Sequence, residues 1–186
     1  LKVEFPDGVR DLFLNVVNHK ITDDTLTVTL SDVFYPISVD LIYKVHYDMD
    51  IIERSSVIRN TGNQNIRLEK AYSASFNIPY GGKCYLTSLG SKWTHEYEEE
   101  RTEVTRARTV IQSGGGVSNS QNFPYFAIDK GQTGRYYGEL WFGTLCWSGN
   151  FKITVENDVM EQVRITGGIS DDDFEWILAP EEIELS

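Results

Sequence analysis

The sequence predicts an all-β fold, namely an antiparallel β-sandwich of two sheets, from three observations. Apolar residues recur at every second position through most of the chain, which is the spacing of a strand with one buried face. Turn-forming residues interrupt the chain about every 8–12 residues, as is typical of strands joined by short turns. No segment has the spacing of an amphipathic helix. We therefore expect about ten strands or more and no helix.

The first half of the chain contains the clearest strand patterns. Residues 25–30 (TLTVTL) alternate large apolar residues with threonine, whose branched Cβ suits a pleated surface. Residues 37–47 place six large side chains on one face, and such a long strand indicates a large sheet. Residues 51–60 follow a Met-Asp pair, which predicts a tight turn. The turn signal at 60–63 (NTGN) precedes a strand-like segment at 66–78.

The second half continues this pattern with longer interruptions. We expect strands near residues 84–89 and 103–111, followed by a glycine- and serine-rich loop at 113–122. Residues 148–150 (SGN) then form a good hairpin turn between strand-like segments. The remaining strand-like segments are FPYFAID, YYGELWFGTLCWS, FKITVEN and EQVRITGGI. No internal repeat or low-complexity linker separates them, so we expect one domain over residues 1–186.

Size and composition exclude several classes of protein. The chain has 186 residues, 40% of them hydrophobic, and a chain of this length can bury about 70% of its extended surface in one core. The net charge of −11 argues against nucleic acid or an anionic membrane as a partner. No apolar run approaches the ~18 residues that a membrane helix needs. Because a strand-like segment begins directly at Leu1, we expect a fragment of a longer protein.

The residue types that most often build metal or redox sites show no recognisable pattern. Cys84 and Cys146 lack the spacing of a zinc or redox site, and we expect two buried free thiols, with one disulfide as the alternative. The histidines share no metal-binding spacing, and no phosphate-binding motif occurs. Residues 171–173 (DDD) offer oxygen ligands for calcium but lack the spacing of an EF-hand. We therefore expect neither a metal nor a cofactor.

Tryptophans are the remaining candidates for a functional surface. Aromatic rings can stack against the C–H faces of sugars, although most aromatic side chains fill the core. Trp141, Trp147 and Trp176 lie within strand patterns, and we expect them in the core. Trp93 follows a loop-like stretch, so the sequence favours neither exposure near a ligand nor burial in the core for this residue.

Several segments resemble, in order, those of one known family. The segment GELWFGTLCWSGNFKITVE resembles a family pattern of the form G-E-x-x-x-F-x-x-x-x-S-G-N-F/W. GISDDDFEWILAPEE resembles G-I-N-x-x-D-F-x-W-x-L-x-P-G-E, with Phe174 and Trp176 as expected packing anchors. The other matching segments are VRDLFLNVVNHKI, LIYKVHYDMDIIERSSVIRNTGNQNIRLEKAYSASFNIP, LTSLGSKWTHEYEEERTEV and NFPYFAI. Together they resemble the N-terminal β-domain of glycoside hydrolase family 36, the α-galactosidases.

The resemblance implies a β-supersandwich related to the galactose-mutarotase-like fold. It also implies a following (β/α)₈ barrel, with the nucleophile in a K-x-D motif and the acid/base in R-x-x-x-D. Neither motif occurs in this chain, so the resemblance implies a non-catalytic domain of a retaining enzyme that hydrolyses terminal α-galactosides. The implied partners are the barrel of the same protein, α-galactoside oligosaccharides and further copies of the full-length protein.

The resemblance also indicates residues for the substrate rim or a subunit interface. Trp93 matches the tryptophan of the family's G-x-W, displaced by one residue. Residues 117–124 (VSNSQNFP) stand where the family has S-x-H-x-H-N-P-F, so amide or hydroxyl side chains replace both histidines. Such side chains can still hydrogen-bond a sugar or order a subunit contact. The candidates are Trp93, Asn119, Gln121 and Asn122.

Two other functions are weighed against this one. A free-standing carbohydrate-binding β-sandwich module would have sugar affinity and exposed aromatic residues on one concave face. A mutarotase-like epimerase would need a general base and a histidine acid in one site, and the histidines have no matching context. If the chain is a fragment, we further expect an exposed apolar patch where the barrel docks.

Overall fold

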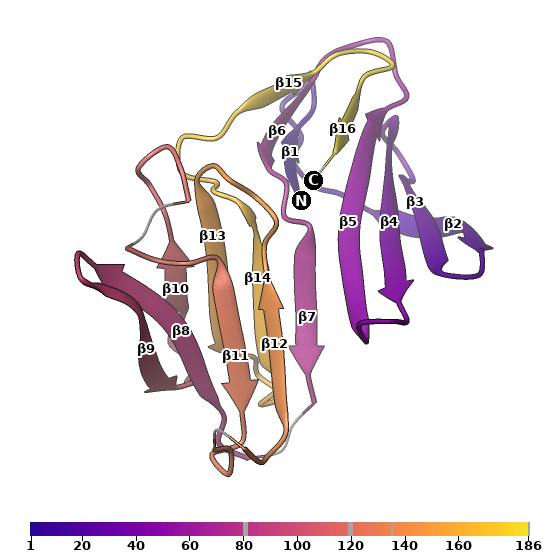
Figure 1. The fold of residues 1–186 in the computed structure, drawn as a ribbon. Coiled ribbons are helices and arrows are strands. Elements are labelled where there is room, and N and C mark those ends of the chain that lie inside the picture. Colours follow the sequence, from indigo (N-terminus) through magenta and orange to yellow (C-terminus); the bar gives the residue numbers. More distant parts are fainter. Residues whose placement is uncertain (80–81, 119–120, 135, 186) are drawn as a thin grey trace. The chain divides into compact units, whose positions relative to one another are not determined.

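The computed structural model describes residues 1–79, 82–118, 121–134 and 136–185. Within them, sixteen strands pair antiparallel in four sheets and no residue is helical, which confirms the all-β antiparallel class (Figure 1). The chain divides into two compact units. Unit 1 comprises Leu1–Ser73 with Asp173–Ser186, and unit 2 comprises Ala74–Asp172. A single domain over residues 1–186 stays a prediction.

Unit 1 contains two sheets. The larger one has the strand order β16 (Ile183–Leu185), β5 (Ile51–Asn60), β4 (Ile37–His46), β3 (Thr25–Asp32) and β2 (Leu14–Ile21). The smaller one has the order β1 (Lys2–Glu4), β6 (Ile66–Lys70) and β15 (Trp176–Leu178). Val39 pairs with Leu30 on one side and Ile58 on the other, so these apolar residues share one face. Both sheets contribute to one core, in which Ile58 and Leu68 are buried and against which Phe174 packs as predicted.

Unit 2 is a sandwich of two four-stranded sheets around one core. The first sheet has the order β10 (Thr109–Gln112), β13 (Phe151–Asn157), β14 (Val163–Ile169) and β7 (Ala74–Ile78). The second has the order β12 (Leu140–Thr144), β11 (Tyr125–Asp129), β8 (Tyr85–Lys92) and β9 (His95–Glu103). Ile153 and Ile165 of the first sheet share a buried cluster with Leu86 and Ile128 of the second. This unit therefore has the layered packing that the alternating pattern predicts.

Two of the tryptophans expected in the core are exposed, and one cysteine is as well. Trp141 is partly buried against the core of unit 2, as expected. Trp147 lies beyond the end of β12 in a turn, where its Nε1 donates to the carbonyl of Asn150 at 3.1 Å. Trp176 begins a three-residue edge strand and is exposed too. Cys146 shares the exposed segment of Trp147, so only Cys84 is a buried thiol, and both are free.

Within the described residues, no helix has the length and apolar character needed to cross a membrane.

Candidate functional site

β8 and β9 form a hairpin (Figure 1). Lys92 pairs with His95, so Trp93 and Thr94 alone form the turn. Thr94, the second residue of the turn, adopts φ = 69°, in the left-handed region that is unfavourable for a β-branched residue. The side chain of Trp93 is 85% exposed. The tip therefore presents a large aromatic surface that is available to a ligand or to another protein.

The second predicted segment lies beside this hairpin. The amide of Ser91 donates to the carbonyl of Gln121 at 3.1 Å. Asn122 forms an isolated antiparallel β-bridge with Gly90 on β8. The side-chain amide of Asn122 donates to the carbonyl of Gln112 at 3.0 Å. The structure thus brings Trp93, Gln121 and Asn122 to one end of β8. Asn119 lies outside the described residues.

An aromatic pair that the sequence analysis missed joins the two segments. The ring of Tyr97 on β9 stacks on Phe123, with centroids 4.3 Å apart and planes at 18°. Tyr97 adopts φ = 62°, and the register of the hairpin shifts between Gly90 and Lys92. This bulge turns Tyr97 toward its partner. No signal for the contact is visible in the glutamate-rich sequence of β9, because the bulge breaks its alternation.

The electrostatic character of the hairpin is acidic. All nine residues of β9 are exposed, and five of them are glutamates. A carboxylate oxygen of Glu98 lies 3.0 Å from Nδ1 of His95, and the other lies 4.0 Å from the Lys92 amine. In the described chain β9 is an edge strand, and charged side chains at an edge oppose further strand pairing. We interpret this charge as protection of the edge.

An ion pair between the exposed Arg101 of β9 and the buried Asp129 of β11 anchors β9 to the sheet. Arg101 donates to both carboxylate oxygens of Asp129, one of them at 2.8 Å, and lies over the ring of Tyr85 at 4.7 Å. The amide of Gly131 also donates to Asp129 at 2.6 Å. The hydrogen bond from Arg101 is the main cause of a lowered pKa for Asp129, although burial acts in the opposite direction. Asp129 is therefore a charged structural group.

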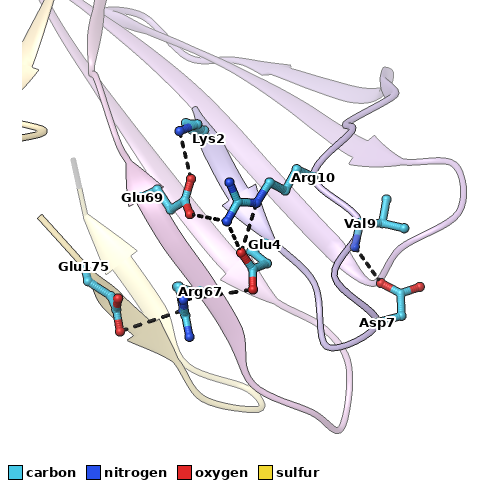
Figure 2. Close-up of polar contacts among 8 residues, drawn as sticks. All are labelled: Lys2, Glu4, Asp7, Val9, Arg10, Arg67, Glu69 and Glu175. Carbon is cyan, nitrogen blue, oxygen red and sulfur yellow. Dashed lines mark hydrogen bonds and ion pairs between the residues drawn. The ribbon is translucent and has the colours of Figure 1, made fainter.

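A polar cluster of a similar kind covers the small sheet of unit 1, and Figure 2 shows its contacts. Arg10 lies between Glu4 and Glu69, at 2.9 Å from the first through Nε and 3.0 Å from the second. The Lys2 amine lies 3.0 Å from Glu69 and is the main cause of the lowered pKa of that carboxyl. Arg67 approaches Glu4 at 4.0 Å. Opposite charges alternate through the cluster, which indicates a role in holding β1 and β6 together.

The acidic run at residues 171–173 is also occupied by protein contacts. The amine of Lys152 lies 2.6 Å from Asp171 and 2.5 Å from Asp172. Burial acts to lower the pKa of Lys152, but these two carboxylates outweigh it and the pKa is raised. Among the described residues, this run included, no group of three or more His, Cys, Asp or Glu side chains is placed to hold a metal ion.

Two hollows in the described surface differ from the hairpin in character. One of about 120 Å³ lies beside Phe5 and Tyr35, below the roughly 300 Å³ at which ligand pockets begin. The other, of about 300 Å³, is lined by Lys83, Glu103 and Arg106, and Lys83 pairs with Glu103 at 3.1 Å. Neither has an exposed aromatic platform, so the hairpin is the candidate site.

Comparison with known proteins gives one consistent result. The family model described as the glycosyl hydrolase family 36 N-terminal domain matches residues 1–179. The α-galactosidase Mel36A of Lactobacillus acidophilus is 31% identical over 97% of this chain and 27% of its own length. The α-galactosidase AgaA of Geobacillus stearothermophilus is 28% identical over 89% of this chain and 23% of its own. The chain therefore spans about a quarter of the length of these relatives.

Solved structures agree with the sequence matches. The family 36 α-galactosidase AgaA from Geobacillus stearothermophilus, in complex with raffinose, superposes with a TM-score of 0.94 and 25% identity. The galactosidase domain of the α-galactosidase–sucrose kinase AgaSK superposes with a TM-score of 0.93 and 25% identity. Each match covers 99% of this chain and 28% of the other.

Proposed function

The chain belongs to the N-terminal domain family of glycoside hydrolase family 36, and from this premise we propose that it is the non-catalytic domain of a retaining α-galactosidase. The family match over residues 1–179 is the observation that carries the proposal. Relatives named α-galactosidases are about four times as long as the matched region. The proposed full-length protein hydrolyses terminal α-galactosides of oligosaccharides, and this domain supports its catalytic barrel.

The chemistry of the described carboxylates supports an inert domain. A retaining glycosidase needs a general acid of raised pKa and a nucleophile about 5–5.5 Å away. Here the two buried carboxylates, Asp32 and Asp129, have lowered pKa values because they accept hydrogen bonds from backbone amides and from Arg101. Lowered pKa values suit fixed structural anions and oppose general-acid catalysis.

The β8–β9 hairpin provides the proposed contact of this domain with substrate or with another subunit. Trp93 is exposed at its tip, and Gln121 and Asn122 lie at the same end of β8. An exposed indole and neighbouring amides can stack on and hydrogen-bond a sugar. From its place in the sequence alone, we assign Asn119 to the same proposed contact with substrate or with another subunit. The full-length protein is proposed to assemble as a homo-oligomer.

Hydrolysis of p-nitrophenyl α-galactoside tests the proposal, with the full-length enzyme and the isolated chain assayed side by side. We expect turnover by the full-length enzyme alone. Turnover by the isolated chain would refute an inert domain. Inactivity of both, together with glycan binding by the chain, would instead favour a carbohydrate-binding module.

A further inference from the structure

A buried carboxylate fixes two loops of unit 1. The Asp32 side chain is only 8% exposed, and its Oδ2 accepts the N–H of Phe13 at 2.5 Å. Its Oδ1 accepts the N–H groups of Phe34 and Tyr35 at 2.8 and 2.9 Å. Burial acts to raise the pKa of Asp32, but these three hydrogen bonds outweigh it and the pKa is lowered. The charged carboxylate therefore holds the backbone of both loops in one conformation.

These fixed loops display apolar side chains. Phe13 is 59% exposed and Phe34 is 72% exposed, and their rings meet edge to face with centroids 5.9 Å apart. Val33 directly precedes Phe34 in the second loop and is also exposed. Its N–H donates to the carbonyl of Phe13 at 3.3 Å. We call Phe13, Val33 and Phe34 the diphenylalanine knob. A mobile loop could turn such residues inward, but a loop fixed by three hydrogen bonds keeps them in solvent.

The knob has the properties of an anchor in a protein interface. Aromatic residues that need little further ordering lose little entropy on binding, and they carry much of the energy at interface centres. The chain covers 27% of the relative Mel36A, so most of an enzyme of that length lies outside it. A tethered neighbouring domain is present at about millimolar effective concentration, so an apolar recess on it would have the advantage over a separate molecule in binding the knob.

We propose that the diphenylalanine knob docks this chain onto the catalytic part of the same polypeptide, which receives it in an apolar recess. The proposal rests on the proposed function only in requiring that such a part exists in the polypeptide. The contact is hydrophobic, because Phe13, Val33 and Phe34 carry no charge.

Hydroxyl-radical footprinting of the full-length enzyme, read by mass spectrometry, tests the docking. Phe5 is 2% exposed and serves as the buried phenylalanine standard in the same unit, and urea-unfolded enzyme gives the exposed standard. We expect Phe13 and Phe34 to react about fivefold or more slowly than in unfolded enzyme, close to the rate of Phe5. The protection should persist on dilution to concentrations at which the enzyme is monomeric.

Two results would overturn the docking. Reaction of Phe13 and Phe34 at the rate of exposed phenylalanine would show that nothing covers the knob. Protection that disappears on dilution would assign the knob to a second copy. The footprint does not depend on turnover, so an inactive enzyme with a protected knob would contradict the proposed function alone.

Discussion

Trp93 and Trp147 show what single residues reveal before a structure is known. The stretch before Trp93 looks loop-like in the sequence but is the end of strand β8, and Trp93 is exposed because it begins the hairpin turn. Trp147 follows a strand-like sequence, but its strand ends at Thr144 and the ring caps a turn instead. Local pattern predicts which residues can be buried, whereas the point at which a strand ends decides whether they are.

Trp93→Ala in the full-length enzyme tests the hairpin tip. Loss of aromatic stacking, worth about 0.5–1.5 kcal/mol, should raise KM for an α-galactosyl oligosaccharide by about two- to tenfold, or weaken subunit association by a similar factor. Tyr136→Ala removes another exposed aromatic ring of unit 2 and should change neither. Steady-state kinetics and sedimentation measure both effects. Wild-type values in both would remove Trp93 from the rim and the interface.

Asp129→Asn tests the ion pair with Arg101. The substitution removes a charge-assisted contact, and since Arg101 is partly exposed, we expect a loss of about 1–3 kcal/mol in the free energy of unfolding. The folded pKa of Asp129 is lowered, so its contribution is present above the unfolded pKa of about 3.9 and is lost as pH falls through the folded pKa.

Urea unfolding at pH 7 and at pH 3 measures both parts of this prediction. The difference in the free energy of unfolding between wild type and Asp129→Asn should be smaller at pH 3 than at pH 7. Glu99→Gln, an exposed carboxylate on β9, the strand that carries Arg101, is the control and should change stability by less than about 0.5 kcal/mol. If this difference in the free energy of unfolding were the same at both pH values, the charge of Asp129 would not contribute to stability.

At the scale of elements, the sequence predicts strands more securely than their ends. The segment at 66–78 has a large residue at every even position except Ala74, from Ile66 to Ile78, and is predicted as one strand. In the structure it is β6 and β7, which belong to different sheets and different units. A break that leaves the alternation intact has no local signal. The Tyr97–Phe123 stack is hidden for the opposite reason, because the β8–β9 bulge breaks the alternation of the strand.

Thr94→Gly tests the strained turn of this hairpin. A β-branched residue at φ = 69° is unfavourable, so glycine should increase the free energy of unfolding by about 1 kcal/mol. Thr102→Gly removes the same side chain from a paired position near the end of β9, where glycine should cost about 0.5–1 kcal/mol. Thermal unfolding of the two variants should therefore move in opposite directions. Destabilisation by both would show that Thr94 makes a contact worth more than its strain.

At the scale of the whole molecule, the residue pattern and the order of the segments predict the fold class and the family. The alternating pattern predicts the all-β class, and the ordered segment matches predict the family that the comparisons show. The division into two compact units has no counterpart in the sequence, because no linker or change in composition marks it. Unit 2 closes around its own core, and unit 1 closes around another.

Trapping the covalent glycosyl-enzyme intermediate of the full-length protein tests the central claim most directly. A slow fluorinated α-galactosyl donor should leave one galactosyl adduct on the nucleophile of a retaining enzyme, and peptide mapping by mass spectrometry locates it. We predict that the labelled carboxylate lies outside the 186 residues described by this sequence. An adduct on a carboxylate within these residues would contradict the account.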